Sequence, residues 1–139
     1  MNSYSHIIFS PGNAKTILDY NIKTDEIKEI TYENPLDNRN FLYAVSWGNC
    51  VILPERKYGK ILIYNVETED VDVLLNVPQC ILRQRTSEHP VILGKPCIMN
   101  DVLYVPVTNS NQVLSMIFVM LRVADMIAKY KSRNFHTFR

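Results

Sequence analysis

This sequence has few glycines, few cysteines and almost no excess of one sign of charge over the other. Its four glycines among 139 residues include no pair spaced to cradle a phosphate group, which excludes the common nucleotide-binding loops. The three cysteines, Cys50, Cys80 and Cys97, are odd in number and lack the short spacing of a metal site. The formal net charge of +1 lacks the basic excess of nucleic-acid-binding proteins. We therefore expect no cofactor, no metal and no nucleic-acid partner.

Long apolar runs are also missing. The longest, at 113–128, is shorter than the roughly 20 residues that span a bilayer and contains Arg122 and Asp125, which argues against a membrane-spanning helix. The first residues, MNSYSHIIFSPGNAK, lack the basic and apolar regions of a secretory signal peptide. With cysteines that we interpret as reduced, mostly buried thiols, these absences predict a cytoplasmic protein.

What the sequence does contain is a repeat. TILDYNIKTDEIKEI at 16–30 is written again as KILIYNVETEDVDVL at 60–74. The copies share a tyrosine, an asparagine and a threonine at matching positions: Tyr20, Asn21 and Thr24, then Tyr64, Asn65 and Thr68. In each copy two β-rich runs flank a short polar loop, and asparagine and threonine side chains favour turns because they hydrogen-bond to the nearby backbone. Each copy is therefore predicted to be a β-hairpin.

The repeated unit extends upstream of the hairpin and contains a proline. Pro54 in NCVILPERKYGKILIYN matches Pro106 in DVLYVPVTNSNQVL, and Pro11 fills the same place in HIIFSPGNAKTILDYN. The segments 41–49 and 92–101 are each predicted to add one further strand. With four strands per unit named A to D, the chain is predicted to run BCD, ABCD, ABC.

This unit resembles a blade of the kelch-like β-propellers. The resemblance is carried by DYNIKTDEI and IYNVETEDV, where a strand ending in Tyr-Asn precedes a threonine-containing turn, and it extends over residues 6–114. The repeat spacing, 44 residues from 16 to 60 and 52 from 54 to 106, is close to the roughly 40–50 residues of a blade. The sequence departs from the kelch pattern because it has no glycine pair and carries Asp25 and Glu69 in the turns. A surface hairpin of an unrelated all-β domain is the alternative.

The predicted fold class is therefore mainly β, with consecutive four-stranded antiparallel propeller-type blades and a C-terminal helix. Propellers have about 4–8 blades, whereas residues 1–114 supply about two to three. An open stack of blades exposes apolar faces and strand edges. We expect either that copies self-associate to complete a ring, or that the chain is a piece of a larger propeller.

The tail, residues 115–139, is apolar and then basic, and it departs from the blade pattern. One interpretation is a helix packed in the core or on a partner, with Arg122 and Asp125 paired on its polar side; a membrane-surface anchor is the sharper alternative. Another is that the tail is translated out of frame. Shifting the frame by two bases at Met116 and Ile117 yields Tyr or His for most serine codons at 115, followed by Asp, as the repeat requires.

One loop contains the candidate binding residues. The segment 81–90, ILRQRTSEHP, intrudes between two predicted blades, and loops on a rigid scaffold are where ligands bind. Together with an aromatic and an arginine from the second blade, it forms the predicted binding patch: Trp47, Arg56, Arg83, Arg85, Glu88 and His89. The alternative is an ordinary polar loop beside a buried tryptophan.

Two classes of function remain open. The first is a noncatalytic binding module that presents its loops to a protein or glycan. The second is a remnant of a propeller-type enzyme, such as a lyase or lactonase, whose site lies in the central channel. The predicted inner strands, FLYAVS and VILGKPCIM, supply no acid or histidine, and no histidine is placed with a nucleophile in a recognisable motif, which favours binding over catalysis. A third possibility is a product without function.

Overall fold

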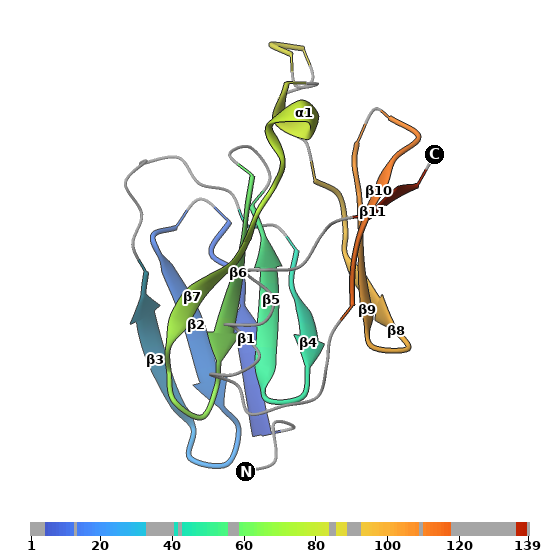
Figure 1. Cartoon of the computed structure of the whole chain (residues 1–139). Helices are drawn as coiled ribbons and strands as arrows, with labels where there is room; N and C mark the ends of the chain where they lie inside the picture. The colour runs from blue at the N-terminus through green and yellow to red at the C-terminus, as the bar shows by residue number, and fades with distance from the viewer. Residues whose placement is uncertain are drawn as a thin grey trace.

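The computed structural model of the 139-residue chain describes residues 5–12, 14–32, 41, 43–55, 59–83, 86–88, 93–108, 110–117 and 136–138. Within these ranges the regular structure consists of eleven strands and one short helix, α1, so the prediction of a mainly β protein is confirmed. The strands form three antiparallel sheets, and each sheet is a meander whose strands follow one another in chain order. Figure 1 shows the second sheet in front of the first and the third sheet beside it.

The first sheet has three strands in the described part of the chain. Its members are β1 (His6–Phe9), β2 (Thr16–Asn21) and β3 (Glu26–Thr31). The β2–β3 hairpin pairs Tyr20 with Ile27, and in its turn the backbone N–H of Asp25 donates a hydrogen bond to the carbonyl oxygen of Asn21 at 2.9 Å. The hairpin predicted for the first copy of the repeat is confirmed.

The second sheet has four strands, one more than the first. They are β4 (Val45–Trp47), β5 (Cys50–Pro54), β6 (Lys60–Asn65) and β7 (Val71–Asn76). The β6–β7 hairpin repeats the earlier geometry, with Tyr64 opposite Val71 and Glu69 N bonded to Asn65 O at 2.8 Å. The hairpin predicted for the second copy is therefore confirmed too.

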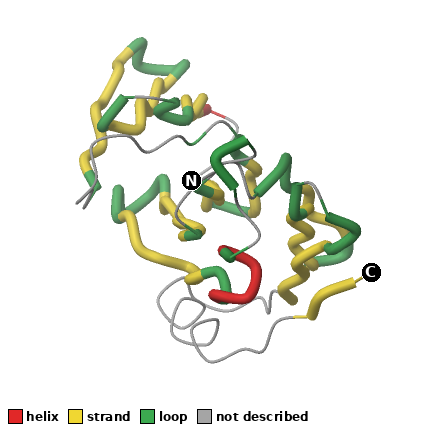
Figure 2. The backbone as a smooth tube through the Cα atoms, turned by 90° about the horizontal axis from the view of Figure 1, so that it is seen from above, coloured by secondary structure: helices red, strands yellow, loops and turns green. Residues whose placement is uncertain are grey.

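The third sheet follows the short helix α1 (Gln79–Leu82), which the sequence analysis did not predict. Its strands are β8 (Cys97–Met99), β9 (Val102–Pro106), β10 (Val113–Ile117) and β11 (His136–Phe138). The last strand comes from the end of the chain and pairs with β10, with Ser115 opposite His136. Viewed from above, the strands gather in separate groups with loops and α1 between them (Figure 2).

The described ends of the tail, 115–117 and 136–138, are strands and not part of the helix expected at 115–139. Ser115 to Ile117 continue β10 and pair with β9, because Met116 carries on the buried side of the strand begun by Leu114. Residues 136–138 form β11, and 118–135 lie outside the described residues. In the part of the chain that the structure describes, no helix has the length and apolar character needed to cross a membrane.

Two apolar clusters hold the sheets together. One joins the first and second sheets and includes Ile17, Ile30, Leu53, Leu62 and Tyr64. The other joins the second and third sheets and includes Ile52, Ile61, Ile63, Leu103, Val105 and Leu114. Because successive side chains of a strand point to opposite faces, the alternating residues of β6 divide between the two clusters. The second sheet is consequently buried on both faces, as β5 shows with all five residues buried.

Candidate functional site

The residues of the predicted binding patch are only partly described. Trp47 lies on β4, where its indole Nε1 donates a hydrogen bond to Asp101 Oδ1 at 3.3 Å and its ring packs against the cluster between the second and third sheets. Arg83 follows α1 and is exposed, as is Glu88. Arg56, Arg85 and His89 lie outside the described residues. Trp47 therefore contributes to contact between sheets, and the patch as a whole stays a prediction.

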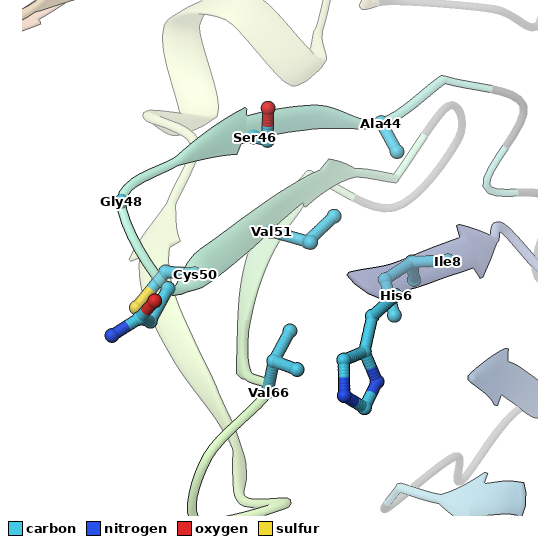
Figure 3. A pocket seen from close by; sticks show the side chains of 9 residues that line it. His6, Ile8, Ala44, Ser46, Gly48, Cys50, Val51 and Val66 are labelled. Atoms are coloured by element: carbon cyan, nitrogen blue, oxygen red, sulfur yellow. The ribbon is translucent and has the colours of Figure 1, made fainter. Parts of the chain in front are cut away.

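A pocket of about 410 Å³ opens elsewhere, between the first and second sheets. It is lined by residues of β1, β4 and β5 and of the segments beside them: His6, Ile8, Ala44, Ser46, Gly48, Asn49, Cys50, Val51 and Val66. Figure 3 shows the His6 imidazole on the side of Val66, with Ala44 and Ser46 along the opposite wall. Its volume lies within the roughly 300–1,000 Å³ of small-molecule sites.

The strand count explains where this pocket lies. In the second sheet β4 pairs with β5, whereas β1 has no partner on its other side among the described strands. In the described part of the chain, the second sheet is thus one strand wider than the first at the edge beyond β1 and β5. Side chains of β4 have no strand of the first sheet to pack against, and the pocket occupies that place.

A buried chain of three polar side chains lies beside the pocket. His6 Nδ1 is 2.6 Å from Asp19 Oδ1, and the Tyr64 hydroxyl donates to Asp19 Oδ2, also at 2.6 Å. Asp19 is 2% exposed and Tyr64 fully buried. Strand register produces this arrangement. Ile8 is paired directly with Asp19, and His6 lies two residues from Ile8 on the same face of β1. His6 is therefore a diagonal neighbour of Asp19. Tyr64 approaches from the second sheet.

The carboxylate determines which nitrogen of His6 is available. An ionised carboxylate only accepts hydrogen bonds, so Nδ1 must carry a proton to bond with Asp19. His6 Nε2 is then a lone-pair acceptor when the ring is neutral and a donor when it is protonated. This atom is buried and has no hydrogen-bond partner among the described residues. A buried polar atom without a partner costs about 1–3 kcal/mol, and no described residue offsets this cost at Nε2.

The other ionisable groups here are held in their neutral forms. Burial and then the hydrogen bond to Asp19 raise the pKa of the Tyr64 hydroxyl far above its ordinary value of 10.0. Burial, with a smaller effect of the Glu67 charge, raises the pKa of the Cys50 thiol to about 11. Since the thiolate is the nucleophilic form of cysteine, Cys50 is inert near neutral pH. Neither the Cys50 thiol nor the Tyr64 hydroxyl is therefore a nucleophile near neutral pH.

Metal coordination has no support in the described ranges. They contain no group of three or more His, Cys, Asp or Glu side chains able to hold a metal ion. The chain of polar side chains has one histidine and one carboxylate, and both oxygens of Asp19 are already engaged by His6 and Tyr64. A metal would have to displace those bonds.

The polar pair of the first sheet is replaced by apolar residues in the second. Register places Cys50 where His6 stands, since they oppose Asn65 and Asn21, and the repeat places Ile63 at the position of Asp19. The difference between TILDYN and KILIYN was therefore the signal that sequence reasoning missed. Asp19 occupies the strand position that Ile63 holds in the other copy, and such a change from isoleucine to aspartate indicates a buried polar group.

No family model matches the chain, and no curated protein matches it.

Proposed function

We propose that this chain is a noncatalytic binding module, built from blade-like sheets of an incomplete, kelch-like β-propeller. Support for the architecture comes from the meander order within each sheet and from the packing of successive sheets face to face. The sequence repeat also follows the sheets, because both repeated hairpins lie at the same place in their sheets. A propeller blade has these properties.

The ligand that suits the pocket is a small polyhydroxylated molecule, so glycan is favoured over protein as the partner. The observation that carries this is the buried, unpartnered Nε2 of His6 beside a 410 Å³ pocket. A hydroxyl group donates to a neutral imidazole and accepts from a protonated one, so it satisfies Nε2 in either state. Ser46 and Asn49 supply further polar groups to the lining.

Ligand-observed NMR tests this proposal. Saturation-transfer difference spectra are recorded for the full chain with glucose, galactose, N-acetylglucosamine and lactose. We expect a signal from at least one saccharide that disappears in His6→Phe and persists in Cys50→Val, a matched change in the same pocket that leaves Nε2 in place. If no saccharide gives a signal dependent on His6, the proposed ligand class is wrong.

A propeller-type enzyme of the lyase or lactonase class is the second candidate, because a histidine oriented by a carboxylate is a common general base. Against it, the pocket lining offers His6 and the inert Cys50 as its ionisable side chains. Hydrolysis of γ-butyrolactone, followed by pH-stat, separates the candidates. We expect no turnover above background, whereas turnover abolished in His6→Phe would establish the enzyme.

A cytoplasmic location is proposed on the state of the cysteines. Cys50, Cys80 and Cys97 are all free thiols, but the expectation that they are mostly buried is wrong, because Cys80 and Cys97 are exposed. Exposed free thiols persist in reducing compartments.

A further inference from the structure

The contacts between sheets always use the same pair of faces. We call the face of a sheet that packs on the preceding sheet its backward face and the other its forward face. In the second sheet the backward face contains Val51, Leu62 and Tyr64, which join the first sheet, and the forward face contains Ile52 and Ile63, which join the third. Each contact therefore joins a forward face to a backward face, and the stack is head to tail.

The first sheet has a backward face with the same character, and no other sheet of the described chain packs on it. Its residues occupy the positions that Val51, Leu53, Leu62, Tyr64 and Val71 hold in the second sheet: Ile7, Phe9, Leu18, Tyr20 and Ile27. Phe9 is 50% exposed and Ile27 is 66% exposed, whereas Leu53 is 1% exposed. The first sheet thus shows to solvent a face that the second sheet buries.

The third sheet shows the complementary face. Its backward face is covered, since Leu103, Val105 and Met116 are buried against the second sheet. Its forward face carries Met99, which is 60% exposed, and Ile117, which is 50% exposed. Met99 is paired with Val102 in the third sheet, just as Trp47 is paired with Cys50 in the second. Met99 therefore occupies the position from which Trp47, in the second sheet, packs on the third sheet.

We infer that the backward face of the first sheet binds the forward face of the third sheet of a second copy of this chain. The occupant follows from the repeat, because the joint would continue the forward-to-backward contact that occurs twice within the chain. Two copies joined at both ends would bring together six sheets, within the about 4–8 blades of closed propellers. This inference rests on the blade-like architecture proposed above and names the surfaces of self-association.

Sedimentation velocity of the full chain tests the inference through two single substitutions. We expect a species of twice the 16.1 kDa chain mass for the unmodified protein. Phe9→Glu and Met99→Glu each place a charge in both joints of a two-copy ring and should weaken self-association at least about tenfold. Gln79→Glu, on exposed α1, is the matched control and should leave the mass unchanged.

Mixing the variants distinguishes head-to-tail contact from other arrangements. Phe9→Glu retains an intact forward face and Met99→Glu an intact backward face, so an equimolar mixture should form a 1:1 dimer that neither variant forms alone. An unmodified protein that is monomeric at high concentration overturns the inference. So does a dimer that Met99→Glu leaves intact, because that dimer would join two like faces. Saccharide binding at His6 can succeed or fail independently of either result.

Discussion

The two hairpins, 16–31 and 60–76, contain the two copies of the sequence repeat and end in different surroundings. Tyr20 and Tyr64 occupy the same place in their hairpins, opposite Ile27 and Val71. Tyr64 is fully buried between sheets and donates to the buried Asp19. Tyr20 lies on the open backward face and donates to Asp25 in its own turn, at 2.9 Å. The same residue thus forms a local contact in one copy and a contact between sheets in the other.

The turns, in contrast, are nearly identical. Asn21 Oδ1 accepts from the backbone N–H groups of residues 23 and 24 at 2.9 and 3.4 Å, and Asn65 Oδ1 accepts from those of 67 and 68 at the same distances. Asp25 and Glu69 both have positive φ, at 58° and 62°. All of these contacts lie within a few residues of one another. The conformation of the turn is therefore determined by residues within the turn, whereas the burial of a strand residue is determined by the sheet that packs against it.

The largest expected difference between the hairpins is the loss of stability when the tyrosine of each is removed. Tyr64→Ala should lower the free energy of unfolding by about 3–5 kcal/mol, because it leaves a cavity and removes a donor to Asp19. Tyr20→Ala should have a much smaller effect. Urea unfolding measures both, in the Phe9→Glu background so that no second copy covers Tyr20. Equal losses would contradict the assignment of Tyr64 to the core.

The next largest difference should be in how ionisation of each tyrosine changes the free energy of unfolding at alkaline pH. Tyr64 ionises near pH 10 in the unfolded chain and at a higher pH in the folded protein, so its contribution to stability is complete below that pH and is lost as the pH rises above it. The free energy of unfolding should therefore fall by up to about 1.4 kcal/mol per pH unit above about pH 10.

Tyr64→Phe should flatten that fall, and Tyr20→Phe should largely preserve it. The Cys50 thiol, with its pKa of about 11, contributes with the same sign and cancels when each variant is compared with the unmodified protein. Urea midpoints between about pH 8 and pH 11 provide the measurement. A slope that Tyr64→Phe leaves unchanged would assign the titration to another group.

The smallest effect tests the similarity of the turns. Asn21→Ala and Asn65→Ala each remove the side-chain acceptor of one turn, and we expect nearly equal losses of about 0.5–1.5 kcal/mol. Equality follows because the bonds are local and their distances match. Thermal or urea unfolding of both variants suffices. Thr24→Val is the control, because it keeps the backbone N–H that donates to Asn21 and removes only the hydroxyl that donates to Glu26. A loss several times larger at Asn65 would show that the second turn depends on its neighbours.

Much of the fold could be predicted from the sequence, and the reasons are local. The hairpins follow from alternating apolar residues and from Asn and Thr at the turns, and the prolines close strands β5 and β9. The helix α1 carries no side-chain cap and spans four residues, so it has almost no local signature. Strand β11 forms by pairing with β10, more than fifteen residues away in the chain, which no local pattern reveals.

The candidate site was missed for the same physical reason. Trp47 and Arg83 were singled out because their residue types often bind, but the structure uses Trp47 between sheets. The pocket depends on the difference in strand number between two sheets, and the polar chain depends on Tyr64 reaching Asp19 across 45 positions. Only the comparison of the repeats, with Asp19 where Ile63 stands, contained a trace of it.

By itself the sequence determined the hairpins and their turns, since these depend on residues a few positions apart. The tertiary structure alone decided which tyrosine is buried, where the pocket opens and which sheet faces remain uncovered. Those outcomes depend on which sheet lies against which. Hydrogen bonds of a turn are satisfied within the segment that forms it, whereas burial requires a partner surface that the segment does not contain.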